Sequence, residues 1–278
     1  MTPVELSLLL VAVGAVAGLA GSLIGLGGGF VVVPVLTLVL GVNVHLAIGA
    51  SVICVIATSS AAAVAFARDR LANLRVGMFL EMATTIGGAT GAWLAAIAQP
   101  KVLFAVFGIV LVHSAVSVWR NREDRPRPEP PPDPVADRLH LHGVYAGDSG
   151  VLVAYRVARS RLALGLMYGA GVLSGLLGVG SGSLKVPAMD GAMGMPIKAS
   201  TATSNFMIGV TAAASAGVYF ARGDVVPILT APLAVGILAG AFTGSRLLPS
   251  VRNAQVRKLF AIIVLAIAVD MIFKGVVL

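Results

Sequence analysis

Two stretches decide how this sequence folds. Residues 25–34 read Gly-Leu-Gly-Gly-Gly-Phe-Val-Val-Val-Pro, and residues 178–187 read Gly-Val-Gly-Ser-Gly-Ser-Leu-Lys-Val-Pro. They begin 153 residues apart, and the same spacing relates Ser51 to Ser204 further along each copy. In both copies a glycine cluster opens a short apolar run. This repetition predicts an internal duplication, which is common in secondary transporters.

The composition around the two stretches is that of a membrane protein. The chain has 278 residues, of which 58% are hydrophobic and 12% are charged, and its mean hydropathy is +0.95. A soluble domain has roughly 25% charged residues. The values exclude a disordered chain, a secreted disulfide scaffold and a typical soluble enzyme. Cys54 is the single cysteine and forms no intrachain disulfide, so it does not report the redox compartment.

Membrane helices need about 20 apolar residues. Longer candidate runs fall at 5–24, 46–67, 76–98, 102–119, 162–177, 199–221, 225–247 and 258–277. The two runs that follow the glycine clusters, 30–41 and 183–194, have twelve residues each and are too short to span. We therefore expect a first membrane repeat (1–119), a Pro/Arg-rich cytoplasmic linker (120–161) and a second membrane repeat (162–278).

Charge placement predicts the orientation. If each glycine turn closes a hairpin, the two halves are inverted, and 16 basic residues lie in loops on one side against three on the other. One broken crossing per half gives 13 against 6, so the positive-inside rule favours the hairpins. We expect an all-α polytopic membrane protein of two inverted repeats, each a glycine-rich re-entrant hairpin plus three transmembrane helices. The net charge of +8 then reports orientation, and nucleic acid is not expected as a partner.

The glycine turns are the predicted binding site. A helix N-terminus offers unpaired N–H groups and a partial positive charge, which suit an anion. Two inverted hairpins would bring two such ends together near the midplane. The alternative is that the glycines only permit close helix packing. The candidate substrate-binding residues are Gly27, Gly28, Gly29, Ser51, Gly180, Ser181, Gly182, Lys185, Ser204 and Asn205.

Three ionisable residues inside apolar runs stand out. Lys185 follows Gly182 by three residues, and Val32 occupies its position in the first copy. A buried lysine is costly and tends to mark an ion or substrate path, although a structural ion pair or snorkelling also accounts for it. Glu81 and His113 are candidate proton-coupling groups, with a packing role as the alternative for each. No metal site and no cofactor are expected.

Other glycines recur at every fourth position, at 87 and 91 and again at 236, 240 and 244. Small residues at this spacing let helix backbones approach closely. These glycine ladders predict close helix crossings, with the interface between the repeats as one place for them.

The doubled motif resembles the TauE/SafE sulfite-exporter family. The resemblance rests on residues 25–34 and 178–187, each opening half of a duplicated membrane protein, and covers the chain apart from the linker. It implies a bacterial inner-membrane carrier of sulfite, sulfonates or related anions, which are bound by the glycine-rich re-entrant regions. Ser181 stands where the first copy has Gly28, and Lys185 has no counterpart, so the resemblance does not imply a symmetric site.

We expect a multi-pass secondary transporter of small sulfur anions, such as sulfite or C2 organosulfonates, with export as the expected direction. Its partners are a small anionic substrate and the lipid bilayer, and homo-oligomerisation is left open. An uncoupled anion channel is an alternative. An intramembrane enzyme is a weaker one, because the sequence lacks His-Glu-x-x-His, Gly-x-Ser-x-Gly and a second cysteine.

Overall fold

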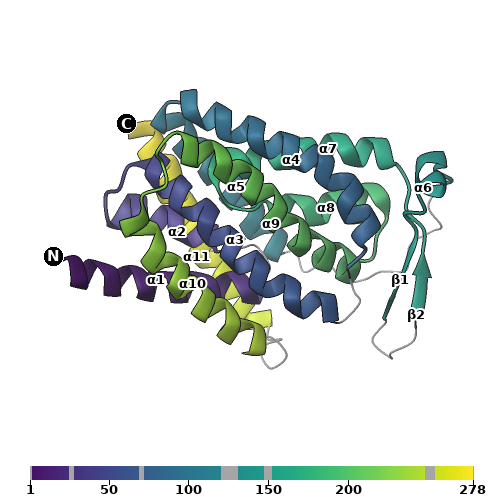
Figure 1. Cartoon of the computed structure of the whole chain (residues 1–278), viewed down its shortest axis with the longest axis horizontal. Helices are drawn as coiled ribbons and strands as arrows, with labels where there is room; N and C mark the ends of the chain where they lie inside the picture. Colours follow the sequence, from purple (N-terminus) through teal and green to yellow (C-terminus); the bar gives the residue numbers. More distant parts are fainter. Residues whose placement is uncertain are drawn as a thin grey trace.

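The computed structural model describes residues 2–24, 28–68, 72–119, 131–146, 152–247 and 254–277, and these are mostly helical (Figure 1). The first half contains α1 (Pro3–Ile24), α2 (Gly29–Pro34), the π-helix η1 (Val35–Val39), α3 (Val44–Arg68), α4 (Leu74–Ile97) and α5 (Pro100–Trp119). A middle segment forms α6 (Pro134–Arg138) and the antiparallel strands β1 (Gly143–Ala146) and β2 (Leu152–Tyr155). The second half contains α7 (Ser160–Leu177), α8 (Gly182–Met193), α9 (Ile197–Ala221), α10 (Pro227–Leu247) and α11 (Ala254–Val277).

Several helices match a bilayer in length and polarity. Segments of α1, α5, α7 and α10 are long and apolar enough to cross a membrane. The helices α3, α4, α9 and α11 have 24 or 25 residues, about 36 Å each. Large apolar side chains such as Ile86, Trp93 and Phe273 are exposed on the outside of the bundle, as lipid contact requires. The prediction of an all-α polytopic membrane protein is confirmed.

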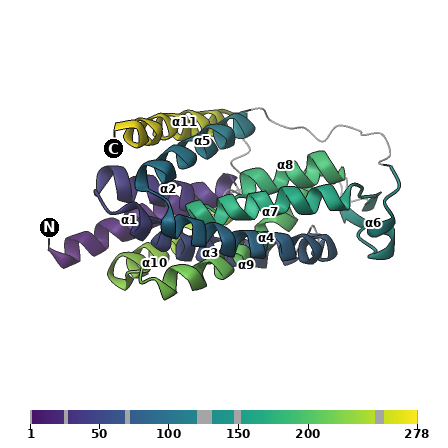
Figure 2. The same cartoon turned by 90° about the horizontal axis from the view of Figure 1, so that it is seen from above.

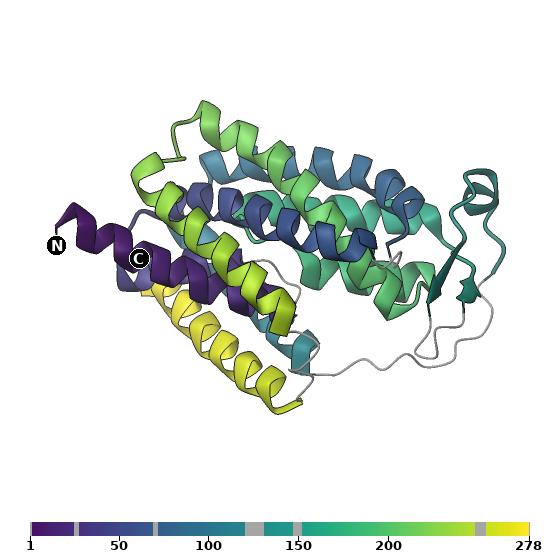
Figure 3. The same cartoon turned by 60° about the horizontal axis from the view of Figure 1, so that its bottom comes forward.

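The largest helix interfaces join the first half of the chain to the second. Helix α1 packs on α10, α4 on α7, α3 on α9, and α5 on α11 (Figure 2). Both chain termini lie at one end of the bundle, whereas α6 and the β1–β2 hairpin lie at the opposite end (Figures 1 and 3). The fold is therefore built from contacts between the halves.

The glycine ladders lie at two of these interfaces. A Cβ atom on Gly91 of α4 would collide with the Val172 main chain of α7, and one on Gly240 of α10 would collide with the Ala15 main chain of α1. The partner helices contribute their own glycines, Gly175 in α7 among them. The prediction that the ladders mark close crossings is confirmed, because any side chain at these positions would push the backbones apart.

The two short segments differ in form. Helix α8 runs without a break from Gly182 to Met193, but the first copy is a six-residue α-helix followed by a five-residue π-helix. The expectation of one short helix after each glycine cluster is therefore wrong in detail for the first copy. The Thr37 hydroxyl donates to the Val33 carbonyl at 2.8 Å within this distorted turn. Pro34 removes a backbone donor there, yet Pro187 lies inside α8 without the same effect.

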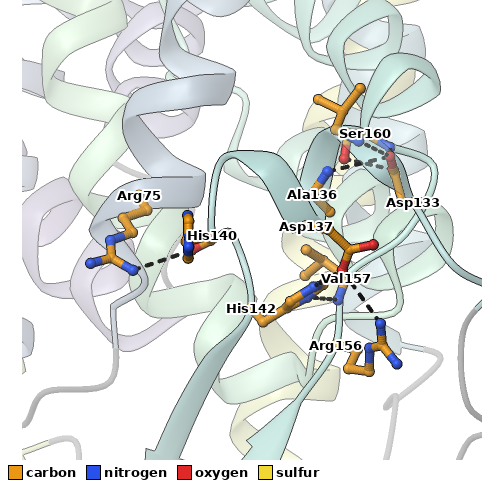
Figure 4. Close-up of polar contacts among 10 residues, drawn as sticks. Arg75, Asp133, Ala136, Asp137, His140, His142, Arg156, Val157 and Ser160 are labelled. Carbon is orange, nitrogen blue, oxygen red and sulfur yellow. Dashed lines mark hydrogen bonds and ion pairs between the residues drawn. The ribbon is translucent and has the colours of Figure 1, made fainter.

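The described part of the linker packs on the helical bundle. Asp133 accepts hydrogen bonds from the backbone N–H groups of Val135 and Ala136, which caps α6, and from the N–H (2.6 Å) and hydroxyl (2.7 Å) of Ser160 (Figure 4). Burial would raise the pKa of Asp133, but these hydrogen bonds outweigh it and lower the pKa. One carboxylate therefore fixes the start of both α6 and α7.

Further polar contacts hold the linker in place. Asn73, the N-cap of α4, donates through Nδ2 to the Leu141 carbonyl and to the Tyr155 hydroxyl, both at 2.9 Å. The N–H of Ala158 donates to the Met193 carbonyl at the end of α8 at 3.1 Å. His142 Nε2 lies 2.8 Å from Asp137 Oδ1 (Figure 4), and this hydrogen bond lowers the pKa of Asp137. The hairpin formed by α7 and α8 is thus attached to the linker at both of its ends, at Ser160 and at Met193.

Candidate functional site

The two glycine clusters meet inside the bundle. Gly27 lies outside the described residues, but Gly28 and Gly29 are buried at the start of α2. A Cβ on Gly29 would lie 2.5 Å from Ser51 Oγ and 2.6 Å from the Gly178 carbonyl oxygen, so only glycine fits there. The Ser51 hydroxyl donates to that same carbonyl at 2.7 Å. The start of the first short helix therefore contacts the glycine turn of the second copy.

Ser51 and Ser204 occupy corresponding positions but differ in their hydrogen bonding. A hydroxyl has one proton, and that of Ser51 is used on Gly178. The Ser204 side chain is 1% exposed, and its hydroxyl has no hydrogen-bond partner within the described structure. An unpaired buried hydroxyl is costly, and it leaves a donor open for a ligand. Ser51 thus joins the two copies, whereas the Ser204 hydroxyl has no acceptor among the residues that the structure describes.

The second glycine turn is held in an unusual backbone conformation. Gly178, Gly180 and Ser181 all have positive φ angles, of 67°, 79° and 45°. Ser181 is the N-cap of α8, yet its hydroxyl does not cap the helix, and within the described part of the chain this buried oxygen is unpaired. A non-glycine residue in this region is strained, which is typical of functional sites. The turn thus presents a free hydroxyl at a helix N-terminus.

A small cavity lies at this turn. Its lining includes Phe30, Ser114, Leu177, Ser181 and Gly182. Its volume is about 10 Å³ for the centre of a water-sized sphere, which is room for about one water molecule. In this conformation the cavity has no room for a larger anion.

Lys185 and Glu81 are connected by a third residue. The ammonium of Lys185 donates to Thr211 Oγ1 at 2.7 Å, and Thr211 Oγ1 donates to Glu81 Oε1 at 2.7 Å. Lys185 and Thr211 are 0% exposed and Glu81 is 8% exposed. Thr85 also donates to Glu81 Oε1 at 3.1 Å. The helices α8, α9 and α4 thus place a cation, a hydroxyl and a carboxylate within two hydrogen-bond lengths.

The sequence did not single out Thr211, although a signal existed. It lies seven residues after Ser204, two helical turns along the same face of α9. The remaining predicted residues are less engaged. Asn205 is buried, but its Nδ2 donates to the Thr201 carbonyl of its own helix at 3.1 Å. His113 is exposed on α5 and does not join the network of Lys185 and Glu81.

The second copy and its neighbouring helices contain several groups that favour negative charge. They are the buried ammonium of Lys185, the hydroxyls of Ser181 and Ser204, which are unpaired among the described residues, and the N-terminus of the twelve-residue α8. Over the described ranges no group of three His, Cys, Asp or Glu side chains is placed to hold a metal ion.

Comparison with known proteins agrees with these features. Residues 10–271 match the family described as sulfite exporter TauE/SafE. The chain is 26% identical over 277 residues to the probable membrane transporter protein YunE of Bacillus subtilis, covering 96% of this chain and 98% of that protein. It is also 26% identical to a probable membrane transporter protein of Xylella fastidiosa, covering 94% of this chain and 93% of the relative. No solved structure matches the chain.

Proposed function

This chain belongs to the TauE/SafE sulfite exporter family, and we propose that it is a secondary transporter of small sulfur-containing anions such as sulfite or C2 organosulfonates. It is a multi-pass membrane transporter of the bacterial inner membrane rather than an enzyme. Export is the proposed direction. The sulfur anion is proposed to bind near the midplane, between the two glycine-rich hairpins.

The buried Lys185 is the observation that carries this proposal. A lysine that is 0% exposed costs several kcal/mol in a membrane protein unless it serves binding or pairing. It lies one turn into α8, where its backbone N–H donates to the Ser181 carbonyl at 3.0 Å. We propose that Lys185, Ser181 and Ser204 bind the oxyanion together with the backbone at Gly180 and Gly182. The opposite side of the proposed site is formed by Gly28, Gly29 and Ser51. Asn205 joins the site after its side chain releases the hydrogen bond to the Thr201 carbonyl.

We also propose that the halves are inverted repeats that exchange roles during transport. If α1 corresponds to α7 and α4 to α10, exchanging the halves converts the α1–α10 interface into the α7–α4 interface. The two remaining large interfaces, α3–α9 and α5–α11, convert into themselves. This pattern supports a pseudo-two-fold axis between the halves. Rocking of one half against the other would open the site to each side in turn.

A binding screen on the purified full chain tests the substrate class. Sulfite, taurine, sulfoacetate, sulfate and methylphosphonate are each added in a thermal-shift assay to the wild type and to Lys185→Ala. We expect sulfur anions to stabilise the wild type and to lose this effect in the variant. The matched control is Thr58→Val, because Thr58 corresponds to Thr211 in the first half and bonds only within its own helix in the described structure. A wild type that binds none of the sulfur anions contradicts the proposal.

Flux in proteoliposomes separates a carrier from a channel. A carrier accumulates the anion against its gradient when a second gradient is supplied, whereas an uncoupled channel only dissipates it. Topology is tested with single cysteines at Arg156 and Arg222 in a Cys54→Ser background. Inverted repeats place these two residues on opposite sides of the membrane, so labelling of both from the same side would refute the arrangement.

A further inference from the structure

We propose that Glu81 and the transported anion alternate as the counter-ion of Lys185, so that each monovalent anion crosses together with one proton. This inference rests on the proposed function and adds the coupling ion, the residue that binds it and the stoichiometry. The network formed by Lys185, Thr211 and Glu81 carries the argument, and we call it the charge relay.

Lys185 and Glu81 are charged partners within the charge relay, and each experiences the charge of the other. Asp190 lies five residues beyond Lys185, on a different face of α8. The state of Lys185 therefore depends on Glu81 and on any anion that enters.

The Thr211 hydroxyl can remain hydrogen-bonded whether the Glu81 carboxyl is ionised or protonated. Its hydroxyl lies 2.7 Å from Glu81 Oε1 and 3.0 Å from the Met207 carbonyl oxygen. Because it has one proton, it donates to one of these acceptors at a time. When Glu81 becomes protonated, Thr211 turns its proton to Met207 and remains an acceptor for Lys185. The hydroxyl thus has two satisfied positions, one for each state of Glu81.

Glu81 has an open position for the proton. Thr211 and Thr85 donate to Oε1 of this carboxylate, whereas Oε2 is buried and has no hydrogen-bond partner in the described structure. An unpaired carboxylate oxygen in a buried site is poorly stabilised. A proton from water binds at this oxygen and leaves Glu81 neutral. The ammonium of Lys185 then has no counter-charge until an anion arrives.

Charge balance gives the stoichiometry. With Glu81 ionised and no anion bound, the charges of Lys185 and Glu81 cancel. When a monovalent anion binds, the site remains neutral only if Glu81 takes up one proton. A net charge buried in a membrane protein is strongly unfavourable, so both favoured states are neutral. The transporter therefore moves one anion and one proton in the same direction, with no net charge, and export is driven by the outward gradient of the anion rather than by proton entry.

The first half does not repeat the charge relay at the corresponding described positions. The positions that correspond to Lys185 and Thr211 are Val32 and Thr58, and Thr58 donates to the Val55 carbonyl of its own helix. The first half therefore offers no second ammonium at this position. His113, the other candidate for proton coupling, is exposed on α5. Coupling is thus assigned to Glu81.

The test uses the full-length wild type in proteoliposomes with isethionate, a sulfonate that stays monovalent across the working pH range. A pH-sensitive dye inside reports protons while labelled isethionate is counted. We expect one proton per anion and rates that do not change when a potassium diffusion potential of either sign is imposed. Isethionate transport with no accompanying proton, or with a rate that follows the potential, overturns the inference. Absence of any sulfonate flux refutes the proposed function instead.

Glu81→Gln tests the residue. It fixes the neutral state, so isethionate binding should lose its pH dependence, whereas binding to the wild type weakens about tenfold per pH unit once Glu81 is ionised. The variant should exchange isethionate across the membrane yet no longer accumulate it on a pH gradient. Thr58→Val should keep full coupling. If Glu81→Gln retains pH-driven accumulation, the assignment of Glu81 is wrong. If it does not fold, the proton count of the wild type still decides the stoichiometry.

Discussion

The two hairpins of this molecule share a sequence pattern but differ in what they contribute. In α8, Lys185 is fully buried and linked through Thr211 to Glu81. In the first copy, Val32 is equally buried among apolar neighbours, and Thr58 bonds to its own helix. The first short segment is also interrupted by a π-helix, whereas α8 is continuous.

The difference shows that packing and chemistry have been distributed unequally over a duplicated fold. Both halves supply glycines to the tight helix crossings, and these crossings match one another closely. The ionisable groups of the charge relay come from α4 in the first half and α8 in the second. Packing is thus shared by the halves, whereas the charge that would attract an anion is concentrated on the second hairpin.

The largest expected effect comes from making the second hairpin resemble the first. Lys185→Val leaves Glu81 without a counter-charge, and breaking a buried pair costs about 3–5 kcal/mol of unfolding free energy. The double variant Lys185→Val with Glu81→Leu should recover most of that stability and still bind no sulfur anion. Denaturant unfolding and the thermal-shift screen measure both. A Lys185→Val protein as stable as the wild type would contradict the structure of the relay.

A larger side chain should destabilise the α4–α7 crossing and the α1–α10 crossing to a similar extent. Gly91→Ala and Gly240→Ala each force two backbones apart, with an expected loss of about 1–3 kcal/mol. Gly165→Ala is the matched control, since a Cβ there meets open space, and it should be neutral or stabilising by up to about 1 kcal/mol. Thermal unfolding compares the three variants. Losses that differ widely between Gly91 and Gly240 would show that packing is not shared equally.

Substitution of Ser51 should lower the stability of the fold, whereas substitution of Ser204 should weaken anion binding. Ser51→Ala leaves the Gly178 carbonyl without its donor and should cost about 1–2 kcal/mol of stability. Ser204→Ala removes an unpaired hydroxyl, so stability should change by less than about 0.5 kcal/mol, while the Kd for a sulfur anion rises about tenfold. Isothermal titration gives the Kd. An unchanged Kd in Ser204→Ala would remove this residue from the site.

The smallest effect concerns the linker, which contacts the start of α7 and the end of α8. Asp133→Ala should cost about 1 kcal/mol of local stability in α6, because its caps are lost. The folded pKa of Asp133 is lowered, so its contribution is complete above the unfolded value of about 3.9 and is lost as the pH falls below it. Hydrogen exchange at Val135 and Ala136 should therefore distinguish wild type from variant at pH 7 but not in strong acid. An equal difference at both pH values would rule out the ionised carboxylate as the cap.

Much of the architecture was predictable from local sequence. The apolar runs, the glycine turns and the four-residue glycine spacing are written in neighbouring residues, and α1, α8 and the tight crossings match them. Lys185 and Glu81 stood out because charge is rare in apolar segments. The connection between Lys185 and Glu81 could not be predicted, because Thr211 is 26 residues from Lys185 and 130 from Glu81. A threonine in an apolar helix is also unremarkable by itself. The docking of the linker likewise depends on distant partners such as Asn73.

The pairing of helices across the halves has a consequence for biosynthesis. While the first half is being inserted, the glycine faces of α1 and α4 have no partners, because α10 and α7 are not yet made. Lipid must occupy those faces until residues 160–247 enter the membrane. The final fold is then reached when α10 and α7 displace lipid from the glycine faces of α1 and α4. The glycine-mediated crossings of the first half are therefore completed only when helices of the second half enter the membrane.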